Sequence, residues 1–100
     1  MNEPRIAQAQ RRVLAAARPC LSAGEYVARV GAAIRMRRKS LGFSQESFAD
    51  SIGMHRAYYG ALERGEKNWQ VSTLVRVAVG LGLQVSQLIE AAEQAHFPRP

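Results

Sequence analysis

Apolar residues recur along most of the chain at intervals of three and four positions, which is the spacing of one face of an α-helix. No segment alternates apolar and polar residues between turn residues, so the pattern contains no strand signal. Helices are therefore predicted over about residues 3–18, 25–41, 45–52, 56–64, 72–79 and 85–95. The predicted fold class is all-α.

Turn residues divide this pattern into a compact set of helices. Ser44 and Ser72 are predicted N-caps, and Gly53 separates two short helices at a point where a left-handed conformation suits glycine. We expect three regions: a basic helical extension at 1–24, a helical domain at 25–95 and a tail at 96–100. The side chains expected to pack inward are Val27, Val30, Ile34, Leu41, Phe48, Ala49, Ile52, Tyr59, Leu62, Trp69, Leu74, Ala78 and Leu81.

Charge is distributed unevenly along the chain, whose net charge is +6. Residues 1–24 carry four basic side chains against one acidic, and residues 25–70 carry eight against five. Residues 71–100 carry two of each. A basic N-terminal two-thirds beside a neutral remainder indicates a polyanionic partner on one side of the molecule.

Several classes of protein are disfavoured by the sequence. It has no glycine-rich nucleotide loop and no nucleophile–base pair at a useful spacing, so we expect no enzyme and no cofactor. His55 and His96 lack partners at ligand spacing, so we expect no metal site. A single cysteine excludes an internal disulfide, and there is neither a membrane-length apolar stretch nor the apolar core of a signal peptide. We therefore expect a cytoplasmic protein with no membrane partner and no apparent small-molecule ligand.

Two short helices joined by a glycine turn, at 45–52 and 56–64, are typical of a helix-turn-helix. In this motif the first helix crosses the phosphate backbone and the second, the recognition helix, enters the major groove of DNA. The motif predicts a DNA-binding protein.

The residues LGFSQESFADSIGMHRAYYGALERGEKN, followed by TLVRVAVGLGL, resemble the phage lambda repressor and Cro type of helix-turn-helix, the XRE family. The resemblance covers residues 34–88, and the His-Arg-x-Tyr start of the recognition helix is similar to restriction-modification controller proteins. It implies a five-helix lambda-repressor-like domain, here with an extra N-terminal helix. It also implies a transcription regulator, for which repression is one mode, with double-stranded DNA as its partner.

The resemblance assigns roles to particular positions. Arg56, Ala57 and Ala61 correspond to base-facing positions, and only Arg56 offers the donors that bridge O6 and N7 of guanine. Arg38 and Glu63 correspond to a structural salt bridge. The other positions expected at the DNA are Ser44 and Gln45 at the start of the first short helix, His55 at the N-cap of the second, Tyr58, Gly60, Arg64 and Lys67.

Other interpretations remain open at this point. The same module occurs in antitoxins and phage-type repressors, and a sparse recognition face is compatible with a protein-interaction module that has lost DNA binding. We expect a homodimer, because one module with a single strong base contact discriminates poorly against other DNA. The candidate dimer surfaces are an apolar stripe in the last helix (Val85, Leu88, Ile89 and Ala92) and, as a rival, the N-terminal helix with Ile6, Val13 and Leu14.

Overall fold

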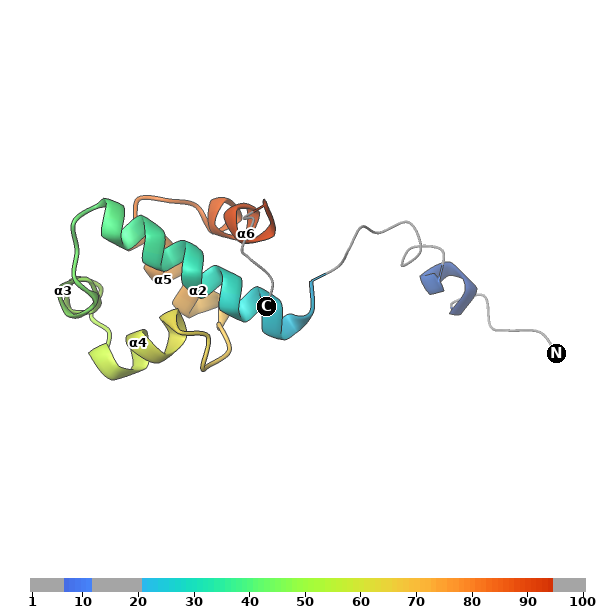
Figure 1. Cartoon of the computed structure of the whole chain (residues 1–100), viewed down its shortest axis with the longest axis horizontal. Helices are drawn as coiled ribbons and strands as arrows, with labels where there is room; N and C mark the ends of the chain where they lie inside the picture. Colours follow the sequence, from blue (N-terminus) through green and yellow to red (C-terminus); the bar gives the residue numbers. More distant parts are fainter. Residues whose placement is uncertain (1–6, 12–20, 95–100) are drawn as a thin grey trace.

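The computed structural model describes residues 7–11 and 21–94, and every regular element within these ranges is helical (Figure 1). Residues 7–11 form a short helical segment. The remaining elements are α2 (Ala23–Ser40), α3 (Gln45–Ser51), α4 (Arg56–Glu63), α5 (Val71–Gly80) and α6 (Val85–Gln94). The predicted all-α fold class is confirmed. The rest of the predicted N-terminal helix, with Ile6, Val13 and Leu14, and the tail lie outside the described residues.

Local sequence signals explain where most of these helices begin. Ser22 and Ser44 each cap a helix through a reciprocal pair of bonds: each hydroxyl accepts from the backbone N–H three residues on, and that residue's side chain accepts from the cap's own N–H. The predicted cap at Ser72 is wrong. α5 begins at Val71 with Gln70 as its N-cap. The Gln70 carbonyl accepts from the N–H of Leu74 at 2.9 Å, and no side-chain capping bond is present.

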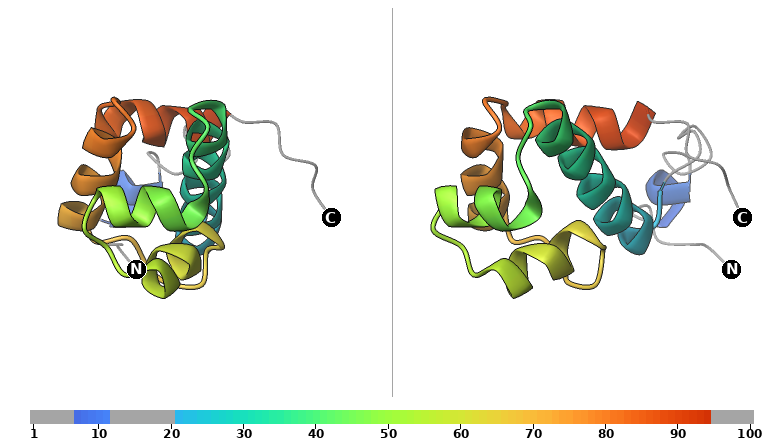
Figure 2. Two further views of the ribbon diagram at one scale, coloured as in Figure 1. Left: turned by 90° about the vertical axis from the view of Figure 1, so that its left-hand side faces the viewer. Right: turned by 60° about the vertical axis from the view of Figure 1, so that its left-hand side comes forward.

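The five helices enclose one apolar core. In Figure 2, α2, α3, α5 and α6 surround this core and α4 lies along its lower side. Leu41 departs from the prediction: it is 43% exposed because it lies beyond the end of α2, at the C-cap. Val27, Ile52 and Trp69 are half-buried rather than enclosed. The largest fully buried side chains are Tyr59, Phe48, Ile34, Leu62, Leu81, Leu88 and Val77.

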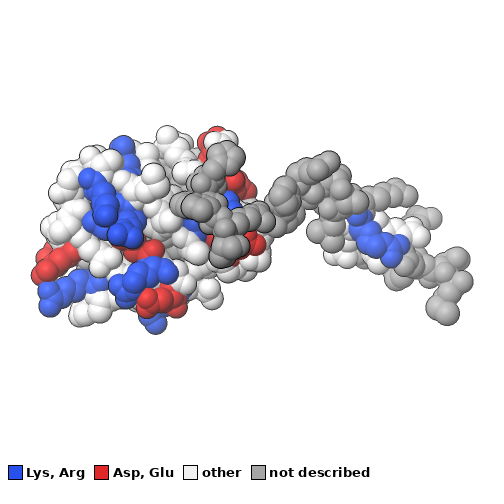
Figure 3. All heavy atoms as spheres, in the orientation of Figure 1, with Lys and Arg blue, Asp and Glu red and all other residues white. Residues whose placement is uncertain are grey.

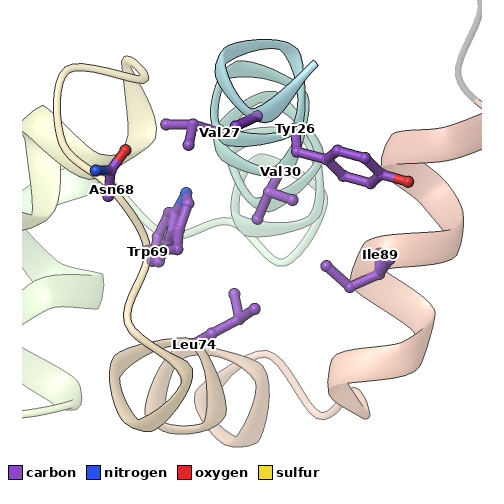
Figure 4. Close-up of a pocket in the computed structure, with 8 residues that line it drawn as sticks. Tyr26, Val27, Val30, Asn68, Trp69, Leu74 and Ile89 are labelled. Atoms are coloured by element: carbon purple, nitrogen blue, oxygen red, sulfur yellow. The ribbon is translucent and has the colours of Figure 1, made fainter. Parts of the chain in front are cut away.

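One apolar cavity of about 430 Å³ lies between α2, α5, α6 and the loop that follows α4 (Figure 4). Its lining includes Val30, Trp69, Leu74 and Ile89. The indole Nε1 of Trp69 is buried and has no hydrogen-bond partner within the described part of the chain. Trp69 is the only tryptophan in the protein, so its fluorescence reports specifically on the packing of this loop against the core.

Within residues 7–11 and 21–94, no individual helix has the length and apolar character needed to cross a membrane. The one helix pair that meets those criteria jointly is α5 with α6, which is bent by 94°.

Candidate nucleic-acid interface

The α3–turn–α4 unit is held together by buried aromatic and aliphatic side chains. Phe48 of α3 and Tyr59 of α4 pack with their ring centroids 5.3 Å apart. Ala49 is fully buried between the helices, where its small side chain allows a close approach. Gly53 adopts a φ of 67° in the turn, a left-handed conformation that other residues reach only with strain. These contacts make the two helices one rigid unit.

An ion pair fixes this unit to the long helix α2. Arg38 donates from Nε and Nη2 to the two carboxylate oxygens of Glu63, at 2.9 and 2.7 Å, and from Nη1 to the carbonyl oxygen of Phe43 at 2.7 Å. Gln45 donates to the same carboxylate at 3.2 Å. The Arg38 and Glu63 side chains are only 7% and 1% exposed. The structure therefore contains the pair that the family resemblance implies, and Gln45 extends it into α3.

Burial and hydrogen bonding act in opposite directions on Glu63. Burial is the largest single influence and raises the pKa of this carboxyl. The hydrogen bond from Arg38, the nearby Tyr59 hydroxyl, Gln45 and the positive charge of Arg38 together outweigh burial and hold the pKa below its ordinary value. The same hydrogen bond raises the pKa of Arg38. Burial, together with the neighbouring Glu63 charge, raises the pKa of Tyr59, whose hydroxyl has no hydrogen-bond partner among the described residues. The site is thus a charged pair inside an apolar framework.

The first turn of α4 projects into solvent. His55 caps the helix through Nδ1, which accepts from the backbone N–H of Ala57 at 3.2 Å. His55 therefore caps the helix with a ring nitrogen rather than with a hydroxyl or carboxylate oxygen. Arg56 and Ala57 follow and are exposed. Arg56 donates from Nη1 to Glu46 of α3 at 2.7 Å, an ion pair in which both side chains are more than 60% exposed.

Farther along α4 the structure modifies the expected interface. Ala61 is only 8% exposed, so little of its methyl group is available to a base, and its expected base-facing role needs correction. Gly60 is buried as well. A Cβ at Gly60 would lie 3.0 Å from both Gln45 Oε1 and Arg64 Nη1, so the missing side chain makes room for protein groups rather than for DNA. Tyr58, expected to point outward, is half-buried against the core.

Exposed charges continue beyond the end of α4. Arg64 pairs with Glu66, with 2.5 Å between Nε and Oε2, and Lys67 is exposed one residue later. Ser44 is exposed at the start of α3, where its hydroxyl already caps the helix. Figure 3 shows basic and acidic side chains interleaved on this side of the domain, where α3 and α4 lie in Figure 1. The surface is therefore mixed in sign rather than uniformly basic.

Two residues important to this arrangement were not identified from the sequence. Glu46 contacts Arg56 across the two helices, and spacing along the chain gives no sign of that contact. Gly31 of α2 is buried where a Cβ would lie 2.5 Å from the carbonyl oxygen of Glu63, so only glycine permits this approach of α2 to α4. Within the described ranges, no group of three His, Cys, Asp or Glu side chains is arranged to hold a metal ion.

Comparison with known proteins agrees with this geometry. A family model described as helix-turn-helix matches residues 34–88. The protein belongs to this helix-turn-helix family. The match confirms the XRE-type resemblance and the lambda-repressor-like fold, and the relatives of this chain are DNA-binding transcription regulators and controller proteins rather than enzymes.

Three members of this helix-turn-helix group illustrate the similarity. The control protein C.MunI of a Mycoplasma species is 35% identical over 60 residues, which are 60% of this chain and 81% of that protein. The clp gene regulator ClgR from Corynebacterium glutamicum has a TM-score of 0.65 at 28% identity, covering 68% of this chain and 72% of that chain. The restriction-modification controller protein C.AhdI from Aeromonas hydrophila has a TM-score of 0.60 at 31% identity, and the match covers 62% of this chain and 94% of that chain.

Proposed function

We propose that this protein is a sequence-specific regulator of transcription that inserts α4 into the major groove of double-stranded DNA. The observation that supports this most directly is the position of Arg56, which extends from the first turn of α4 with its side chain 65% exposed. N-terminal residues of a recognition helix are the ones that contact base edges, and arginine to guanine is the commonest specific contact. Ala57 beside it offers a methyl group to thymine.

The remaining exposed residues suit contacts to the DNA backbone. Lys67 and Arg64 follow the recognition helix, and Ser44 precedes α3, which crosses the backbone in this motif. Gln45, expected at the DNA, is half-buried and its amide is bonded to Glu63. Phosphate contacts fix the register of a protein on DNA without selecting sequence. Because two similar proteins are described as a control protein and a restriction-modification controller, we propose a controller-type regulator, ahead of an antitoxin or a phage repressor.

Fluorescence anisotropy of labelled duplexes tests this function. The protein should bind genomic DNA fragments, and affinity should fall steeply between about 50 and 200 mM salt because phosphate contacts release counterions. At the higher salt concentration a subset of fragments should remain bound. Equal loss of binding to all fragments would contradict sequence recognition, and no binding at either salt concentration would favour a protein-interaction module.

We also propose that the protein acts as a homodimer, through a surface different from the one favoured by the sequence. Leu88 and Ala92 of the α6 stripe are at most 1% exposed, because α6 packs against the core of its own domain. Val85 and Ile89 also pack against that core. The stripe in the last helix is therefore already used within the monomer.

α5 offers an alternative stripe of exposed valines. Val71, Val75 and Val79 follow one another at intervals of four and are 75%, 45% and 72% exposed. In Figure 2, α5 lies across the core from α2, and α4 lies below both. A two-fold axis that passes beside α5 and runs vertically in the left-hand view of Figure 2 would leave both copies of α4 facing the same side. Two recognition helices about 34 Å apart would then contact successive major grooves of a roughly palindromic site.

A further inference from the structure

Glu46 occupies the first turn of α3 and reaches across to the first residue of α4. Its Oε1 accepts from Nη1 of Arg56 at 2.7 Å, and both side chains are well exposed. Exposed pairs of this kind contribute little to folding, since solvent screens them and ordering two long side chains costs entropy. The contribution of this contact to the stability of the fold is therefore small.

The edge of the guanidinium that Glu46 uses is informative. Arg38 shows how an arginine of this protein makes a two-pronged contact: Nε and Nη2 donate side by side to the two oxygens of Glu63. The same two-donor geometry matches O6 and N7 of guanine. Arg56 bonds Glu46 through Nη1, and its Nε and Nη2 have no hydrogen-bond partner in the described part of the chain. Glu46 thus holds the side chain while leaving its recognition edge open.

Arg64, the other exposed arginine near this surface, is arranged in the opposite way. Its Nε donates to Glu66 Oε2 at 2.5 Å and its Nη2 donates to Glu66 Oε1 at 3.4 Å. The recognition edge of Arg64 is therefore engaged by a neighbouring carboxylate. The two pairs have similar exposure but different geometry, which makes each a control for the other.

We propose that Glu46 is a positioning residue for DNA specificity, which orients Arg56 towards a guanine and keeps it from settling on phosphate. This rests on the proposed function. A guanidinium already held through Nη1 loses less conformational freedom when its Nε and Nη2 meet the base. The Glu46 carboxylate also repels phosphate oxygens, which weakens binding to all DNA. Only a site with a guanine opposite Arg56 compensates for that repulsion, so the affinity for random DNA falls more than the affinity for the preferred site.

Competition binding with Glu46→Gln tests the proposal, with Glu66→Gln as the matched control. The probes are a duplex that the wild-type protein selects from random DNA and a scrambled duplex of the same composition. Glu46→Gln should bind the scrambled duplex more tightly and reduce the ratio of the two affinities about tenfold, part of what one bidentate base contact provides. Glu66→Gln should strengthen binding to both duplexes and leave the ratio unchanged. Both variants should melt at the wild-type temperature.

The Arg56→Ala background separates positioning from direct base contact. If Glu46 acts through Arg56, adding Glu46→Gln to Arg56→Ala should leave the affinity ratio where Arg56→Ala alone sets it. A further tenfold fall in that background would overturn positioning, because Glu46 would then contact a base itself. An unchanged ratio for Glu46→Gln alone, in a wild-type protein that discriminates, would overturn this inference only. A wild-type protein that selects no duplex would overturn the proposed function together with it.

Discussion

Glu63→Gln removes the charge from a carboxylate that receives two hydrogen bonds from Arg38 and one from Gln45. The Arg38 side chain is only 7% exposed, so water cannot replace the lost partner. Breaking a buried ion pair by changing one partner costs about 3–5 kcal/mol. The glutamine oxygen can still accept one bond, so we expect the lower end, about 3 kcal/mol.

For a domain of this size each kcal/mol lowers the melting temperature by roughly 4–8 °C, so Glu63→Gln should melt at least about 12 °C below wild type. Thermal unfolding followed by Trp69 fluorescence and by circular dichroism measures this. Glu66→Gln removes an exposed carboxylate of the same type and should leave the melting temperature unchanged. Equal melting temperatures for Glu63→Gln and wild type would refute the conclusion that the buried pair anchors α4 to α2.

Three further outcomes follow from the same structure. The pKa of Glu63 is lower in the folded protein than in the unfolded chain. The ionised Glu63 carboxylate therefore stabilises the fold fully above its ordinary pKa, and this stabilisation is lost as the pH falls through the folded-state pKa. In urea titrations, the difference in free energy of unfolding between wild type and Glu63→Gln should therefore become smaller below about pH 4.5. Gly31→Ala should destabilise the domain by about 1–3 kcal/mol, because its Cβ meets the backbone of α4. Gly24→Ala, whose Cβ meets nothing within 4 Å, should be neutral or stabilising in the same titration. Light scattering should give about twice 11 kDa for wild type and for Met36→Glu but about 11 kDa for Val79→Glu, although both substituted residues are similarly exposed. A dimeric Val79→Glu would exclude α5 as the dimer surface.

The helices themselves could be predicted because local signals and core packing agree. Ser44 both caps α3 and precedes the buried pair Phe48 and Ala49, and Gly53 supplies the left-handed turn between α3 and α4. At α5 the local signal misled, since Ser72 is a good cap in isolation but the helix starts one residue earlier. With the helix beginning at Val71, Leu74 and Val77 are buried in the core. Local helix propensity alone does not reveal this packing.

The interface was less predictable because it depends on distances between helices. The family resemblance placed Arg38 opposite Glu63, and the structure contains that pair. Exposure along α4 depends on how the helix is rotated against α2, and that rotation buries Ala61. The contact from Glu46 to Arg56 joins residues ten positions apart on two different helices, so neither helical spacing nor motif matching indicates it.

The central claim is that the protein recognises a DNA sequence through Arg56 in the first turn of α4. The most direct test selects bound duplexes from random DNA, in parallel for wild type, Arg56→Ala and Lys67→Ala. Wild type should enrich a roughly palindromic site with a guanine at the same position of each half. Arg56→Ala should lose preference at that position and bind the wild-type site more weakly by about 1–3 kcal/mol for each half-site. Lys67→Ala should keep the same preferred sequence and bind all duplexes less tightly. An identical enriched site for wild type and Arg56→Ala, or no enrichment by wild type, would contradict recognition of DNA through the first turn of α4.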